Sequence, residues 1–149
     1  MEYFAYSQKA FVYKYVVMLS DIDQFKHTSF ANYLKLMFLA TDALLVSCLN
    51  ADFLANRRLG LVNSKLQFKR QTKVGDNILI KINSSNINDC EFSLLYTFAI
   101  EGSGELVALG RQVYTLLSRE TDSPEQISDN IKTLLDPINV DENHLLYKY

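Results

Sequence analysis

The sequence contains few of the features that mark secreted, membrane or nucleic-acid-binding proteins. It has two cysteines, Cys48 and Cys90, too few for a disulfide framework, and its first residues do not resemble a signal peptide. The formal net charge is −2, so no basic surface is expected to attract nucleic acid or an anionic membrane. No internal repeat, low-complexity segment or linker interrupts the 149 residues. These absences favour a single cytoplasmic globular domain, residues 1–149, with neither nucleic acid nor a membrane as a partner.

The chain does contain one long hydrophobic run, residues 30–49. Lys35 and Asp42 interrupt it, and each would cost about 2.5–3.5 kcal/mol at the centre of a membrane helix, so a membrane span is not expected. Apolar residues recur at helical spacing, and further apolar residues occupy most of the other positions around the helix. This pattern predicts a core helix buried on nearly all sides, with Thr28 or Ser29 as its N-cap.

The rest of the chain is typical of strands. Val, Tyr and Phe are frequent in residues 10–19, which predicts a first strand before the helix. Turn sequences separate four further strands after the helix, expected over residues 61–72, 78–85, 91–100 and 106–118. Consecutive strands with short connections form an antiparallel sheet. The sequence therefore predicts an α+β fold in which a curved antiparallel sheet wraps round one long central helix.

Three further segments complete the expected organisation. Residues 55–60 are expected to form a loop that carries two exposed arginines. A short helix is expected over residues 125–135, with Pro124 at its first position. The domain core then spans about residues 10–135, and residues 136–149 are expected to form a C-terminal tail.

The densest polar cluster lies between the first strand and the core helix. Residues 21–33 read DIDQFKHTSFANY, with two carboxylates, one of the two histidines of the chain and a tyrosine. This segment resembles the pattern D-x-D-x-x-G-H-V-N-x-x-x-Y of the 4-hydroxybenzoyl-CoA thioesterase-like family, which has the hot-dog fold. Four positions match that pattern directly: Asp21, Asp23, His27 and Tyr33. The segments LQFKRQTKVGDNILIKI and GELVALGRQVYTLLSRETDSP also resemble family strands, so that the resemblance covers about residues 10–135.

The resemblance implies an acyl-CoA or acyl-carrier-protein thioesterase without a cofactor. It assigns the catalytic carboxylate to Asp23, which would attack the thioester carbonyl or activate a water molecule. His27 would position the substrate, and Asn32, Tyr33 and Arg70 are candidate substrate-binding residues. It also implies a homodimer or homotetramer with sites formed between protomers. Lys26 stands where the family usually has glycine, which favours the alternative of a hot-dog protein that binds an acyl group or a carrier protein without hydrolysis.

The start of the predicted helix adds backbone hydrogen-bond donors to the candidate site, and this follows from physical chemistry alone. The first backbone N–H groups of a helix have no partner within it and carry positive potential. If the helix starts near Thr28 or Ser29, the N–H groups of Phe30 and Ala31 can hold an oxyanion. A metal site is not expected, because the Asp21-x-Asp23 pair has no third ligand at usable spacing.

Overall fold

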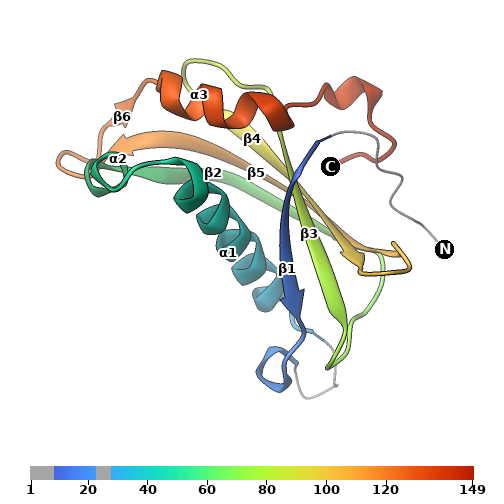
Figure 1. The fold of residues 1–149 in the computed structure, drawn as a ribbon. Coiled ribbons are helices and arrows are strands. Elements are labelled where there is room, and N and C mark those ends of the chain that lie inside the picture. Colours follow the sequence, from blue (N-terminus) through green and yellow to red (C-terminus); the bar gives the residue numbers. More distant parts are fainter. Residues whose placement is uncertain (1–8, 23–27) are drawn as a thin grey trace.

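The computed structural model describes residues 9–22 and 28–149, with the side chains of Ser47 and Cys48 left out. The strands pair in the order β1-β3-β4-β5-β2 in one antiparallel sheet, and β6 pairs with β5 (Figure 1). The strands are β1 (Phe11–Val16), β2 (Arg57–Phe68), β3 (Asn77–Ser85), β4 (Phe92–Ile100), β5 (Leu106–Ser118) and β6 (Pro124–Glu125). The helices are α1 (Phe30–Cys48), α2 (Ala51–Asn56) and α3 (Asp129–Leu135).

Helix α1 lies along one face of the curved sheet, and α3 lies near one end of the sheet (Figure 1). Tyr33 and Met37 of α1 are fully buried against this face, in one apolar cluster with Ile80 and Phe98. A Cβ atom on Gly110 of β5 would lie 2.6 Å from the Cε atom of Met37, so the glycine leaves room for the end of the Met37 side chain between α1 and the sheet. The expected sheet around one central helix is therefore observed.

One side of α1 departs from the expectation. Phe38 and Val46 are 43% and 69% exposed, although the sequence predicted a helix buried on nearly all sides. The reason is that one sheet covers only one side of a helix, and no described element of this chain covers the other. An apolar stripe is left on the surface.

Several boundaries were predicted wrongly. Strand β1 ends at Val16, and a 3₁₀ turn over Leu19–Asp21 follows it. The expected loop at residues 55–60 is instead the end of α2 and the start of β2. The short helix α3 starts at Asp129, because the Ser128 side chain caps it, and Pro124 lies in β6.

The C-terminal segment packs on the sheet face opposite α1. Residues 93, 95 and 97 of β4 alternate with the core-facing residues, and they too are buried. Glu142 accepts hydrogen bonds from Ser85 of β3 and Arg111 of β5, and the Tyr149 hydroxyl bonds to Thr97 of β4. The segment expected as a tail therefore covers part of the outer face.

Within residues 9–22 and 28–149, no helix combines the length and the apolar character that crossing a membrane requires.

Candidate active site

The N-terminus of α1 is the first element of the candidate site. Ser29 is the N-cap, and its Oγ accepts a hydrogen bond of 3.4 Å from the Asn32 backbone N–H. This is one of the two caps that the sequence predicted. The N–H groups of Phe30 and Ala31 come before the first intrahelical donor, and no described residue accepts a hydrogen bond from them. Two donors at the positive end of a 19-residue helix are thus available to an anionic or polarised oxygen.

A groove of about 650 Å³ opens at this helix end. It is lined by Thr28, Ser29, Phe30, Tyr33, Phe68, Lys69, Arg70 and Gln71. The Phe68 ring contacts both of the other aromatic rings, with its centroid 5.6 Å from that of Phe30 and 5.0 Å from that of Tyr33. Phe30 and Phe68 are exposed. The groove therefore combines backbone donors at its helical side with an aromatic wall.

Three hydroxyl groups meet beside the groove. The Thr72 Oγ1 atom lies 2.6 Å from Thr28 Oγ1 and 2.8 Å from the Tyr33 hydroxyl. Burial raises the pKa of Tyr33, although the hydrogen bonds to Thr72 and Thr28 act in the opposite direction. Tyr33 is therefore a neutral hydroxyl at neutral pH. The three side chains tie the start of α1 to the segment that follows β2.

Arg70 brings a positive charge to the groove. Its guanidinium forms an ion pair with Glu105, and both side chains are partly buried. Because the guanidinium has five N–H donors, one carboxylate does not occupy all of them. Lys69 also lines the groove, so its lining includes two cationic side chains.

Asp21 and Asn32 stabilise the chain before the helix. One oxygen of the Asp21 carboxylate, Oδ2, accepts hydrogen bonds of 2.8 Å from the Tyr15 hydroxyl and from the Met18 backbone N–H. The Asn32 side-chain amide donates a bond of 2.5 Å to the Asp21 carbonyl oxygen. Both side chains have structural partners, and neither lines the groove.

The structure brings together some of the residues predicted for the site. Phe30, Tyr33 and Arg70 line one groove, and Ala31 presents its N–H at the same helix end. Asp23, Lys26 and His27 lie outside the described residues. The amide of Asn32 points to the loop rather than to the groove.

The sequence suggested no site role for Phe68 and Thr72, and it suggested Thr28 only as a possible N-cap of the helix. The alternation along residues 61–72 already places Phe68, Arg70 and Thr72 on one face of the chain, which is the signal that could have identified them.

Within the described part of the chain, no group of three histidine, cysteine, aspartate or glutamate side chains could hold a metal ion.

The sequence matches the family model of the thioesterase-like superfamily over residues 17–135. It has no match among the curated proteins. The fold is similar to a 1,4-dihydroxy-2-naphthoyl-CoA thioesterase from Synechocystis, with 19% identity, a TM-score of 0.75 and coverage of 86% of this chain and 96% of that one. It is also similar to a gentisyl-coenzyme A thioesterase, with 20% identity, a TM-score of 0.74 and coverage of 83% and 98%.

A third similar structure is a Staphylococcus aureus protein in complex with CoA. It shares 16% identity with this chain, the TM-score is 0.77, and the alignment covers 89% of this chain and 85% of the other. At these identities the similarity to solved structures establishes the fold, which is the hot-dog fold that the sequence predicted.

Proposed function

The chain belongs to the thioesterase-like superfamily and is a thioester hydrolase, and on this premise we propose that it hydrolyses an acyl-CoA at the N-terminus of α1. The observation that carries the proposal is the position of the Phe30 and Ala31 N–H groups, which have no described acceptor and belong to the helix end that lines the groove. A thioester carbonyl in this groove would direct its oxygen at the two donors. They would stabilise the negative charge that develops on it, and one such donor typically contributes about 2.7–4 kcal/mol to the transition state.

In the proposed mechanism Asp23 is the catalytic carboxylate. In one route its oxygen attacks the carbonyl carbon, the C–S bond breaks, and a mixed anhydride forms that water then hydrolyses. In the other route it takes a proton from a water molecule, which attacks instead. Both routes release the thiol and a carboxylic acid. His27, adjacent to Thr28 in the sequence, is proposed to position the thioester.

CoA is the preferred carrier because of the cationic side chains in the groove lining. Lys69 and Arg70 line it, and a CoA carries phosphate groups that cationic side chains bind. Two of the similar structures are CoA thioesterases and the third is bound to CoA, which supports this choice. An acyl-carrier protein would present one phosphate at this place, so it remains the second candidate carrier.

The functional unit is proposed to be at least a homodimer. Strand β2 is an edge strand, bonded to β5 on one side, and Val62 is 57% exposed. Long edge strands with exposed apolar side chains are ready to pair with another strand. The apolar stripe of α1, with Phe38 and Val46, adjoins this edge through a shared cavity with Leu61. A second copy paired along β2 would cover both.

The alternative function is binding of an acyl group or a carrier protein without hydrolysis. Lys26 favours it, because a side chain at this position restricts the backbone in a way that the family's glycine does not. The two functions differ in one measurable property, the release of thiol.

The proposal is tested by thiol release from a panel of short-chain, long-chain and aromatic acyl-CoA substrates, measured with the purified full chain. The proposal expects turnover of at least one class. Binding of these compounds without turnover would support the alternative, and neither binding nor turnover would contradict both.

A further inference from the structure

The outer face of the sheet, opposite α1, is buried along strand β4. All residues from Phe92 to Ala99 are buried, although successive side chains of a strand point to opposite faces. Leu95 belongs to the outer face, and so does Leu109, which lies directly opposite Thr97 in the pairing of β4 with β5. The core cluster beneath α1 includes neither leucine among its described residues. An antiparallel sheet often has one face in water, but here the second face carries a small apolar layer that needs a cover.

The cover is the end of the chain, residues 141–149, which we call the cover segment. Leu145, Tyr147 and Tyr149 are half-buried, and the two residues between them are exposed. Apolar and aromatic side chains at alternate positions therefore meet the outer face, while the side chains between them are in water.

The first half of the cover segment is held by a carboxylate. One oxygen of Glu142 accepts a hydrogen bond of 2.9 Å from the Ser85 hydroxyl and one of 2.6 Å from the Asn86 side-chain amide. Its other oxygen pairs with the Arg111 guanidinium, and both of these side chains are partly buried. Arg111 also donates a hydrogen bond of 3.1 Å to the Ser93 hydroxyl, which orients the guanidinium. Several donors of the sheet thus converge on one acidic side chain.

The last residues of the cover segment are held by an aromatic side chain. The Tyr149 hydroxyl bonds to that of Thr97 on β4, which is fully buried. The Gln67 amide of β2 donates a hydrogen bond of 2.9 Å to the Lys148 carbonyl. Because the carboxylate end contacts β3 and this end contacts β2, the cover segment crosses the strands that carry the apolar layer.

The residues just before the cover segment are attached in a different way. The Val140 N–H donates a hydrogen bond of 2.8 Å to the Ser84 carbonyl, and Ser84 forms a parallel bridge with Asn139. This attachment is backbone pairing with β3, whereas the hydrogen bonds of the cover segment described above each involve a side chain of the sheet. The cover segment therefore resembles a bound peptide more than a further strand.

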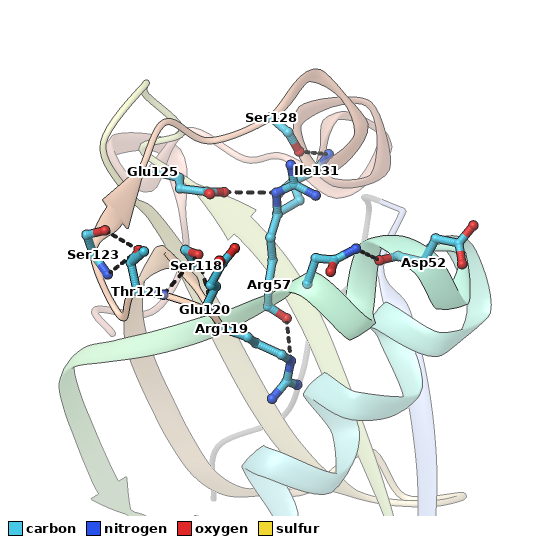
Figure 2. Close-up of polar contacts among 11 residues, drawn as sticks. Asp52, Arg57, Ser118, Arg119, Glu120, Thr121, Ser123, Glu125, Ser128 and Ile131 are labelled. Carbon is cyan, nitrogen blue, oxygen red and sulfur yellow. Dashed lines mark hydrogen bonds and ion pairs between the residues drawn. The ribbon is translucent and has the colours of Figure 1, made fainter.

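Helix α3 is also anchored without the cover segment. The Ser128 side chain caps it by accepting a hydrogen bond of 3.4 Å from the Ile131 N–H, and Glu125 pairs with Arg57 at 2.9 Å (Figure 2). Ile131 belongs to the core cluster on the opposite face of the sheet. Departure of the cover segment from the outer face would leave all of these contacts in place.

We propose that the outer face of the sheet is a peptide-binding site, which the cover segment occupies as an intramolecular ligand that binds and leaves without unfolding of the domain. The ligand class is a short peptide with a carboxylate, which Ser85 and Arg111 bind, followed by apolar and aromatic side chains at alternate positions. The occupant is this chain's own residues 141–149, and while they are bound the apolar layer is closed to other chains.

Urea titration of the full chain tests whether the cover segment leaves separately. The chain has no tryptophan, so Tyr147→Trp supplies a single fluorescent reporter. We expect its emission to shift to longer wavelength at a lower urea concentration than the loss of the far-UV circular dichroism signal. Adding Glu142→Gln should weaken docking at least about tenfold and move only the fluorescence midpoint, because charge-assisted hydrogen bonds are lost. Adding Glu120→Gln, an exposed carboxylate outside the site, should move neither. One joint transition in both signals would overturn the proposal.

A labelled synthetic peptide, DENHLLYKY, tests the binding site by fluorescence anisotropy. It should bind the full-length Glu142→Gln variant about tenfold more tightly than wild type, because the weakened cover segment competes less for the site. The same peptide carrying Glu142→Gln should bind this variant at least about tenfold more weakly. Absence of binding to the variant, or equal binding to the variant and to wild type, would overturn the proposal. This assay decides alone if Tyr147→Trp disturbs the fold, and since no thioester is present, both results are independent of the hydrolytic activity.

Discussion

The hydroxyl of Tyr33 lies 2.8 Å from that of Thr72, which also contacts Thr28 at 2.6 Å. The residues come from the first turn of α1, from the segment after β2 and from the residue before the N-cap. Thr72 is therefore the centre of a small network that holds the helix N-terminus against the wall of the groove.

This arrangement predicts that Thr72→Val destabilises the protein more than Tyr33→Phe. The first change leaves two hydroxyl groups without their shared partner, which costs about 1–3 kcal/mol for a buried group. The second leaves Thr72 and Thr28 bonded to each other. Urea denaturation measures both free energies of unfolding, with Thr133→Val as the exposed control, expected within about 0.5 kcal/mol of wild type. Equal losses for Thr72→Val and Tyr33→Phe would contradict the network.

A second prediction concerns alkaline pH. Burial, and then the hydrogen bond to Asp21, raise the pKa of Tyr15 to about 12. Burial likewise raises the pKa values of four other tyrosines, Tyr33, Tyr96, Tyr114 and Tyr149. Above pH 10 the unfolded chain loses these protons while the folded chain keeps them, so that stability is lost as pH rises through the range above 10.

The measurement is absorbance at 295 nm during alkaline titration, together with thermal unfolding from pH 8 upward. A fraction of the nine tyrosines should ionise late in the folded protein, and all of them near the ordinary pKa in urea. Identical titration curves in buffer and in urea would show that the burial argument is wrong.

The ion pair between Arg70 and Glu105 leads to a third prediction. If Arg70 contacts CoA phosphates, Arg70→Gln should raise KM for an acyl-CoA by about tenfold, because one charge-assisted hydrogen bond is lost. The same acyl group on N-acetylcysteamine, which lacks phosphates, provides the control and should show no change. A rise of equal size for both substrates would mean that Arg70 acts on the structure of the groove and not on the phosphates.

The proposed dimer leads to a fourth prediction. Val62→Lys on β2 should shift the protein toward monomer in sedimentation velocity, since a charge on an edge strand opposes pairing. Val12→Lys on β1, the opposite edge of the sheet, is the matched control and should leave the assembly intact. A monomeric wild type, or dissociation caused by the β1 variant alone, would contradict pairing along β2.

The elements that the sequence predicted well are those with local signals. Helix α1 begins after Ser29, one of the two expected caps, and its apolar residues recur at helical spacing. The start of β2 has no such signal, because the pairing of Arg57 with Ser118 across the sheet determines it. For α3, both Pro124 and Ser128 are residues that often stand at the start of a helix. Pro124 pairs with β5 as part of β6, so the helix starts only after Ser128.

The candidate site shows the same division. The backbone donors at Phe30 and Ala31 follow from the helix start alone, so they could be predicted. The alternation along residues 61–72 places Thr72 on the same face as Arg70, but its hydrogen bonds could not be predicted, because its partners Tyr33 and Thr28 are 39 and 44 residues away in the sequence. Asn32 was predicted as a substrate contact, yet its amide bonds to the Asp21 carbonyl, an arrangement that only the folded loop reveals.

The most direct test of the proposed function is the rate of thiol release by Asp23→Asn, compared with wild type and with Asp129→Asn, an exposed aspartate of α3. We predict that Asp23→Asn keeps the wild-type circular dichroism spectrum and loses activity by at least about 100-fold, as expected for a catalytic carboxylate. Asp129→Asn should remain within about twofold of wild type. An active wild type whose rate survives the Asp23→Asn substitution would contradict the proposed role of Asp23.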